Sequence, residues 1–287
     1  MSHAGPNRAH PPSPAAGVRE IAPDGEPMTL TLSAAGCEIE YRWAGRLSQD
    51  QPCIVLLHEG LGSVAMWKTF PERLARRTGC AVFVYSREGY GRSSPLSRPR
   101  QPDYMHHEGE VVLPAVLDAA QIEQAVLFGH SDGASIALIG AATHPKRVTG
   151  LVLEAPHVFV EPLTLSSIAE SKRIFETTDL CDRLARYHHD PRGAFWGWND
   201  IWLDGRFEHW NIEFYLPRIT CPTLLIQGRE DNYGTLAQLD SIAERSRGPT
   251  QVVVLDRCGH APHRDRAEAV LAEAQAFTRA LGSAAPA

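Results

Sequence analysis

One serine, set between two glycines at the junction of a strand and a helix, constrains this chain more than any other feature. Apolar residues at 125–128 predict a strand, and small residues at 134–142 predict a helix. The turn between them must be sharp, so the positions two before and two after Ser131 must be almost free of side chain, and Gly129 and Gly133 meet that need. Free N–H groups at the start of the helix would then face the Ser131 hydroxyl. A flexible Gly/Ser turn without chemistry is the alternative, and the flanking strand and helix argue against it.

Strand and helix patterns alternate along most of the chain. Continuous apolar runs suit parallel strands buried on both faces, and they occur at 53–57, 81–85, 148–153, 221–227 and 251–255. Helical patterns occur at 67–78, 104–120, 235–245 and 265–281. Pro114 predicts a kink in the second of these helices. Alternating residues at 28–33 and 37–43 predict a hairpin at one edge. These patterns predict an α/β fold with a mainly parallel, doubly wound sheet flanked by helices.

Composition divides the chain into a tail, a core and an insertion. Residues 1–26 are rich in proline, alanine and glycine, and we expect a disordered tail because such a stretch buries too little apolar surface to offset its ordering entropy. Residues 157–218 show no strand pattern and hold 11 of the 22 aromatic residues. We interpret them as a helical, aromatic-rich lid inserted into a core of residues 27–156 and 219–287. The alternative is that the aromatics only pack this segment onto the core.

Charge and cysteine content limit the classes of partner and the compartment. The net charge is −6 and no basic cluster occurs, which argues against a nucleic-acid partner. No apolar run approaches the roughly 20 residues of a membrane-spanning helix, so no membrane partner is expected. Six cysteines without C-x-x-C spacing, and no signal peptide, favour a cytoplasmic location. We interpret most cysteines as buried, with Cys258 as an alternative thiol at the rim of a site.

Three residues with complementary chemistry follow the ends of predicted parallel strands. Ser131, Asp231 and His260 are separated by 100 and 29 residues, and the carboxyl ends of parallel strands meet at one edge of a sheet. A serine hydroxyl is a weak nucleophile unless a neutral imidazole removes its proton, and a carboxylate fixes the tautomer of that imidazole. We therefore predict Ser131 as the nucleophile, His260 as the base and Asp231 as the acid that orients the base.

Four other residues compete for these roles. We expect His130, next to the serine, to point away from it and to serve packing. We expect His263, close to the last helix, to lie on the surface. Glu230 and Glu154 are alternatives to Asp231 as the acid, and both rank below it.

Residues from about 28 to 281 resemble the α/β-hydrolase superfamily. The resemblance rests on the serine turn, on the loop that begins at His58, on the Gly-x-x-Asp segment ending at Asp231 and on the Gly-His-x-Pro-His segment around His260. It implies the α/β-hydrolase fold, with a mostly parallel, eight-stranded type of sheet and a helical lid inserted before the strand that carries the acid. Residues 86–94 also resemble a loop of this fold whose arginine usually braces its neighbours.

The same resemblance implies an oxyanion hole and a substrate pocket. The loop after the third strand of this fold often reads His-Gly-x, which makes the N–H of Gly60 one oxyanion donor and the N–H of Asp132 the other. This sequence has Glu59 where glycine is usual, and a carboxylate near a developing anion is unfavourable unless its side chain turns away. Four residues are predicted to line the substrate pocket: Glu59, His157, Trp198 and Trp202.

Within the superfamily the chain looks most like small lidded bacterial enzymes that act on esters, enol-lactones or vinylogous 1,5-diketones. The resemblance implies a serine hydrolase that cleaves a small carboxylic ester, a lactone or a C–C bond next to a carbonyl through an acyl-enzyme on Ser131, with a small-molecule substrate and water as partners. It implies no metal and no organic cofactor, and His106 and His107 diverge on a helix rather than forming a metal site. Two alternatives stay open, a small-molecule receptor with slow or single turnover and a perhydrolase or haloperoxidase side activity.

Overall fold

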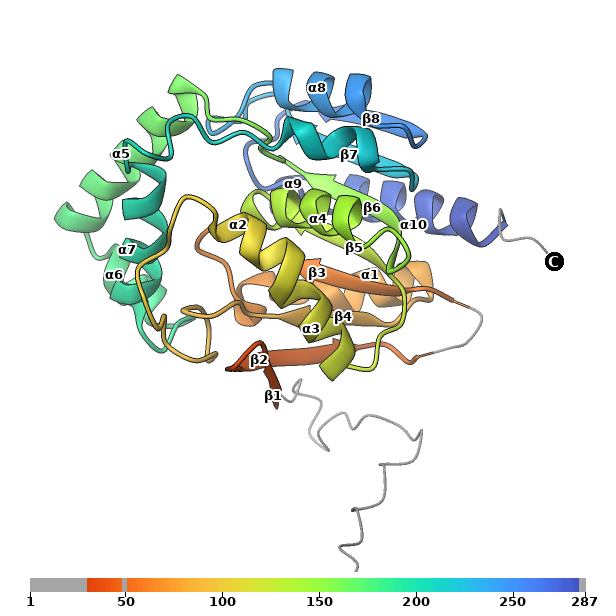
Figure 1. Cartoon of the computed structure of the whole chain (residues 1–287), viewed down its shortest axis with the longest axis horizontal. Coiled ribbons are helices and arrows are strands. Elements are labelled where there is room, and N and C mark those ends of the chain that lie inside the picture. The colour runs from red at the N-terminus through yellow and green to blue at the C-terminus, as the bar shows by residue number, and fades with distance from the viewer. Residues whose placement is uncertain (1–29, 48–50, 284–287) are drawn as a thin grey trace, which may run out of the picture.

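An eight-stranded sheet runs through the computed structural model, which describes residues 30–47 and 51–283 (Figure 1). The strand order is β1-β2-β4-β3-β5-β6-β7-β8. The strands are β1 (Leu30–Ala34), β2 (Cys37–Ala44), β3 (Cys53–Leu57), β4 (Val82–Tyr85), β5 (Ala125–His130), β6 (Val148–Glu154), β7 (Thr223–Gly228) and β8 (Thr250–Leu255). The predicted tail at residues 1–26 lies outside the described residues.

The sheet is antiparallel at one edge and parallel elsewhere. Strand β1 pairs with β2 and β2 pairs with β4 in antiparallel register, and the remaining neighbours pair in parallel. Strands β3, β4, β5 and β7 are buried along their whole length, which explains their runs of apolar residues. The predicted edge hairpin and the mainly parallel sheet are both confirmed.

Helices cover both faces of the sheet. They are η1 (Val64–Trp67), α1 (Phe70–Thr78), α2 (Tyr104–His107), η2 (Glu108–Val112), α3 (Leu113–Ala119), α4 (Asp132–Thr143), α5 (Pro162–Thr177), α6 (Leu180–Leu184), α7 (Pro191–Trp202), η3 (Glu213–Arg218), α8 (Ala237–Arg245), α9 (Pro262–Asp265) and α10 (Ala267–Ser283). Helices α1 and α10 pack on one face, and α2, α3, α4 and α8 lie on the other (Figure 1). Among the described residues, no helix is both long and apolar enough to span a membrane.

The helix predicted at 104–120 is interrupted where the sequence predicts a kink. Helix α2 passes into a π-helical turn, η2, before α3 begins, and Pro114 is the second residue of α3. Proline has no N–H to donate and crowds the preceding turn, so a wider turn is the local solution. Close packing on α4 requires glycine here, because a Cβ atom at Gly109 would lie 2.7 Å from Ile139 Cγ2.

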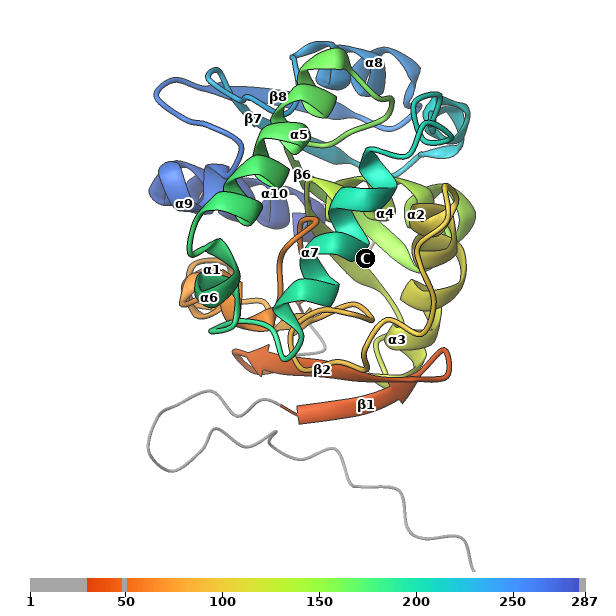
Figure 2. The same cartoon turned by 90° about the vertical axis from the view of Figure 1, so that its left-hand side faces the viewer.

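A helical segment separates β6 from β7. Helices α5, α6 and α7 lie beyond the ends of β5, β6 and β7 (Figures 1 and 2), and their buried side chains join the same hydrophobic cluster as the sheet. Aromatic residues of the segment between β6 and β7 pack largely on one another. The rings of Phe175 and Phe195 stack with centroids 3.8 Å apart, and the ring centroids of Trp202 and Phe207 are 5.0 Å apart. The division at residues 157 and 218, and the action of this segment as a lid, stay predictions.

Candidate active site

Ser131 lies at the sharp turn that joins β5 to α4. Its backbone has φ 53° and ψ −119°, a conformation that costs a residue with a side chain about 1–3 kcal/mol. A Cβ atom at Gly129 would lie 2.5 Å from the Cα of Ala134, and one at Gly133 would lie 2.1 Å from the carbonyl oxygen of Leu57. Both glycines are therefore needed because backbone meets backbone on each side of the serine.

The structure brings Ser131, His260 and Asp231 into one hydrogen-bonded row. Nε2 of His260 lies 3.0 Å from Oγ of Ser131, and Nδ1 of His260 lies 2.9 Å and 3.0 Å from the two carboxylate oxygens of Asp231. The three residues follow β5, β8 and β7, whose carboxyl ends meet at this edge of the sheet. With the Nδ1 proton donated to Asp231, Nε2 keeps a lone pair for the Ser131 hydroxyl, as a base requires.

Asp231 is held ionised by its surroundings. Burial would raise the pKa of this carboxyl, but the hydrogen bond and charge of His260 and the backbone N–H of Tyr233 hold that pKa below its ordinary value. The amide of Gln227 donates to the same carboxylate at 3.3 Å. The ring of Tyr233 packs against His260, with centroids 4.6 Å apart. These contacts fix the imidazole in one orientation.

Two backbone N–H groups beside the serine are free to bind an oxyanion. In the described part of the chain, neither the N–H of Gly60 nor that of Asp132 donates to a protein acceptor. Asp132 is the first residue of α4, so its N–H has no partner within the helix. A Cβ atom at Gly60 would lie 2.1 Å from Nε1 of Trp198, so glycine is required for the indole to pack on this loop.

Two buried side chains hold the loop that carries Gly60. The guanidinium of Arg87 donates to the carbonyl oxygens of His58 at 2.5 Å and Glu59 at 2.9 Å. Nδ1 of His58 donates to the same carbonyl of Glu59 at 2.6 Å, while Nε2 accepts the backbone N–H of Arg87. Burial, helped by the charge of Arg87, lowers the pKa of His58 well below its ordinary value, so this ring is neutral. The loop is therefore rigidly placed.

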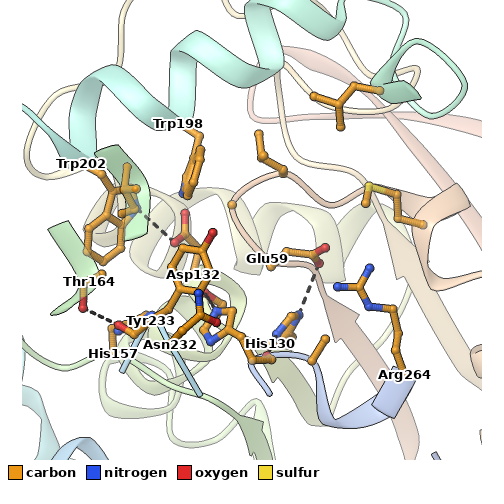
Figure 3. Close-up of a pocket in the computed structure, with 18 of the residues that line it drawn as sticks. Glu59, His130, Asp132, His157, Thr164, Trp198, Trp202, Asn232, Tyr233 and Arg264 are labelled. Atoms are coloured by element: carbon orange, nitrogen blue, oxygen red, sulfur yellow. Dashed lines mark hydrogen bonds and ion pairs between the residues drawn. The ribbon is translucent and has the colours of Figure 1, made fainter. Parts of the chain in front are cut away.

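The side chain of Asp132 links the serine turn to the helical insertion. Its carboxylate accepts the Tyr104 hydroxyl at 2.6 Å. It also accepts the indole N–H of Trp202 at 3.3 Å (Figure 3). Burial raises the pKa of Asp132 above its ordinary value, although Arg87 and these two donors oppose that shift. Both donors occupy the Asp132 carboxylate itself, while its backbone N–H stays free.

Ser131 borders a cavity of about 420 Å³, whose lining Figure 3 shows. Its border includes the four predicted pocket residues: Glu59, His157, Trp198 and Trp202. Apolar side chains of the insertion complete much of the wall: Ile168, Leu180 and Leu184. Several other bordering residues were not predicted from the sequence, among them the polar residues Thr164, Asn232, Tyr233 and Arg264. Three of these follow Asp231 or His260 within four positions, which was an available signal, whereas Thr164 reaches the site only through the fold of α5.

His130 does not point away from the site, so its prediction as a packing residue is wrong. It borders the cavity, with Nδ1 3.4 Å from a carboxylate oxygen of Glu59 and Nε2 2.6 Å from the carbonyl oxygen of His260. Burial alone would lower the pKa of His130, but Glu59 raises it above the ordinary value. The prediction failed because β3 and β5 are neighbours in the sheet, which places the loop after one beside the end of the other.

The predicted surface position of His263 is also wrong. This side chain is buried, and its Nδ1 lies 2.6 Å from a carboxylate oxygen of Glu154. The ring packs against Trp67 at 4.6 Å between centroids, under the start of the last helices. Glu154 is thus engaged with His263 rather than His260. The other alternative acid, Glu230, accepts the backbone N–H of Cys258 at 2.7 Å and does not touch the imidazole of His260 in the described structure.

His157 is a neutral histidine at the border of the cavity. Burial, together with the charge of His260, lowers its pKa to about 3. Its ring lies edge-on to Trp202 at 5.3 Å between centroids and 5.7 Å from the ring of His260. Its Nδ1 is buried without a hydrogen-bond partner in the described chain.

The structure also bears on the cysteine and histidine alternatives. Cys258 is 2% exposed, so it is buried and not a rim thiol, and burial raises its pKa to about 12. His106 stacks on exposed Phe214 at 6.4 Å between centroids. Over residues 30–47 and 51–283, no group of three or more histidine, cysteine, aspartate or glutamate side chains is placed to hold a metal ion.

Comparison with known proteins agrees with this architecture. A model of the alpha/beta hydrolase family matches residues 54–274, and the chain belongs to that family. The mouse protein named Serine hydrolase BPHL is 24% identical over 250 residues, which cover 80% of this chain and 82% of that protein. The 2-hydroxymuconate semialdehyde hydrolase of Pseudomonas sp. strain CF600 is 29% identical over 225 residues, covering 70% of this chain and 76% of that protein.

A solved structure extends the comparison to the fold. The enol-lactonase of Burkholderia xenovorans LB400 superposes with a TM-score of 0.70 at 20% identity, covering 87% of this chain and 100% of that chain. At this identity the likeness concerns the fold alone. The predicted α/β-hydrolase fold is confirmed.

Proposed function

We propose that the chain is a serine hydrolase that cleaves a small carboxylic ester, a lactone or a C–C bond next to a carbonyl through an acyl-enzyme on Ser131. One observation carries the proposal. Ser131, His260 and Asp231 form a hydrogen-bonded row with 3.0 Å and 2.9 Å separations, and Ser131 and His260 line a cavity. In this arrangement the imidazole can remove the proton of the serine hydroxyl, and the carboxylate stabilises the imidazolium that forms. Together the three groups make the serine a nucleophile.

The first half of the reaction forms the acyl-enzyme. Nε2 of His260 takes the proton of the Ser131 hydroxyl while Oγ attacks the carbonyl carbon of the substrate. The N–H groups of Gly60 and Asp132 hold the resulting oxyanion, and donors of this kind are worth about 3–4 kcal/mol each. When the tetrahedral intermediate collapses, His260 gives its proton to the leaving group.

The second half returns the enzyme to its starting state. His260 takes a proton from a water molecule, whose oxygen attacks the acyl carbon. A second oxyanion forms and collapses, the Ser131–acyl bond breaks, and His260 returns the proton to Oγ. Asp231 stays ionised throughout and stabilises the imidazolium in both halves. Cleavage of a C–C bond uses the same steps with a carbon leaving group, so this row of residues is compatible with each of the three bond types.

The relatives support a hydrolytic role, because they are named as a serine hydrolase and a 2-hydroxymuconate semialdehyde hydrolase. The apolar wall that Ile168, Leu180 and Leu184 add to the cavity suits a small organic substrate. We further propose that α5, α6 and α7 act as a lid, since they supply that wall and Trp198 reaches down to Gly60.

A substrate panel tests the proposal. Aryl esters, lactones and dienoate diketones are assayed with the wild type, with Ser131→Ala and with Ser97→Ala, an exposed serine, as the matched control. We expect multiple turnovers on at least one class, loss of activity in Ser131→Ala and full activity in Ser97→Ala. Full activity of Ser131→Ala on the best substrate would refute the mechanism. A single slow turnover would instead favour the small-molecule receptor.

A further inference from the structure

The proposed reaction leaves Glu59 without a role, although this residue borders the cavity directly before Gly60. Its carboxylate folds back over its own loop, because a Cβ atom at Gly62 would lie 2.4 Å from Oε2 of Glu59. Oε2 faces His130, and the Glu59 side chain keeps 18% of its surface exposed. Within the described residues, no protein donor bonds to the second oxygen, Oε1. Because Glu59 borders the cavity and its side chain is partly exposed, this oxygen is available to accept a hydrogen bond from a ligand.

The carboxylate is ionised and its charge is locally balanced. Burial would raise the pKa of Glu59, but His130 holds that pKa well below its ordinary value. Nε2 of His130 donates to the carbonyl of His260, and Nδ1 lies 3.4 Å from the carboxylate without a hydrogen bond of good geometry in the described residues. Glu59 raises the pKa of the ring, which favours its protonated form. Glu59 and His130 thus form an ion pair with no net charge.

The pair defines a polar side of the cavity. In Figure 3, Glu59, His130 and Arg264 lie on one side, and Trp202, Thr164 and His157 lie on the other. Arg264 is exposed and brings positive charge to the side that already holds the balanced pair. Glu59 is one residue from the proposed donor Gly60, and His130 is one residue from Ser131, so this side is close to the reacting carbonyl.

We propose that Glu59 is a specificity-determining residue whose carboxylate accepts a hydrogen bond from a neutral hydroxyl group of the substrate, close to the scissile carbonyl. The inference rests on the proposed function and assigns its substrate class as hydroxylated esters or lactones. A hydroxyl donor fits better than an ammonium group, because His130 already balances the Glu59 charge and Arg264 repels a second cation. A carboxylate on the substrate has no proton to donate to the oxygen of Glu59.

Matched substrates test this role. Values of kcat/KM are measured for the 4-nitrophenyl esters of butyrate, 2-hydroxybutyrate and 3-hydroxybutyrate with the wild type, Glu59→Gln, Glu59→Met and the control Glu244→Gln, an exposed glutamate on α8. The readout is the ratio of the better hydroxy ester to butyrate, because damage to the fold lowers both values together. We expect this ratio to fall about tenfold in Glu59→Gln and up to about 100-fold in Glu59→Met, since a hydrogen bond to a charged group is lost. Glu244→Gln should leave it unchanged.

Other outcomes overturn the inference in distinguishable ways. An unchanged ratio in both Glu59 variants, with Ser131→Ala inactive on every ester, would refute the role of Glu59 and leave the hydrolase proposal intact. A wild type that prefers the 3-aminobutyrate or succinate half-ester over both hydroxy esters would refute the substrate class. Turnover of the hydroxy esters by Ser131→Ala would instead refute the proposed function itself.

Discussion

His130 and His157 both lie beside His260, yet their surroundings drive their pKa values in opposite directions. Their ring centroids are 5.2 Å and 5.7 Å from that of His260, and both side chains are buried. Burial lowers the pKa of a histidine, and at His157 it does so to about 3. At His130 the carboxylate of Glu59 outweighs burial and raises the pKa.

The difference comes from the elements that meet each ring. His130 ends β5 and faces the loop after β3, where Glu59 replaces the glycine usual in this fold. His157 follows β6 and faces the edge of Trp202 on the insertion. The sheet side of the cavity is therefore ionic and the insertion side neutral. Burial alone does not decide a histidine's charge, because one carboxylate within 4 Å reverses its effect.

The largest expected effect is the loss of catalytic activity when His260, rather than a neighbouring histidine, is replaced. Of these three histidines, His260 is the one that bonds to the Ser131 hydroxyl in the described structure, so we expect His260→Gln to lower kcat/KM by about 10⁴- to 10⁶-fold. His157→Gln should cost no more than about tenfold, because in the described structure no hydrogen bond joins its ring to Ser131, Asp231 or His260. Steady-state kinetics on the best ester measures both. Equal losses in the two variants would mean that His157, and not His260 alone, handles the proton.

A smaller effect is expected on the free energy of unfolding in acid, where His157 and His130 should act in opposite directions. The pKa of His157 is lowered in the folded state, so the unfolded chain takes up the proton first and stability falls as the pH drops from about 6.5 towards 3. The stability lost is several kcal/mol at about 1.4 kcal/mol for each pKa unit. His157→Gln should remove this loss, and His209→Gln, at an exposed position, should not. Urea unfolding at several pH values between 7 and 4 measures it, and identical pH profiles would contradict the neutral state of His157.

The smallest effect tests the ion pair at His130. We expect His130→Gln to lower the free energy of unfolding by about 2 kcal/mol at pH 6, less than for a fully buried pair because Glu59 faces the cavity. Because the pKa of His130 is raised in the folded state, its stabilisation of the fold is fully present below about pH 6.5. This stabilisation is lost as the pH rises through the folded-state pKa of His130. Because the pKa of Glu59 is lowered in the folded state, its stabilisation of the fold is fully present above about pH 4.5 and is lost at lower pH.

Urea unfolding across pH 4 to 9 should therefore show the cost of His130→Gln to be greatest between about pH 4.5 and 6.5. Glu59→Gln in the same background serves as the control, since it should add little once His130 is absent. A cost that is independent of pH would indicate lost packing instead of a lost ion pair.

Much of the architecture could be predicted because it depends on local patterns. The apolar runs that became β3, β4, β5 and β7 and the two glycines around Ser131 follow from strand burial and turn sterics, which act over a few residues. The kink near Pro114 was predicted for the same reason, although its form as a π-helical turn was not. Wrong predictions fell on His130 and His263, whose partners Glu59 and Glu154 are 71 and 109 residues away in sequence.

The sequence by itself determined that a strained serine would end a buried strand of a parallel sheet, because hydrophobic periodicity and the absence of side chains at two positions are local properties. Only the tertiary structure decided which carboxylate faces which histidine. Strand order brings the ends of β3 and β5 together and seats His263 against Glu154, and no short-range pattern encodes that order. Electrostatic interactions fall off over a few ångströms in space, so the charge of each group depends on neighbours that the linear chain keeps far apart.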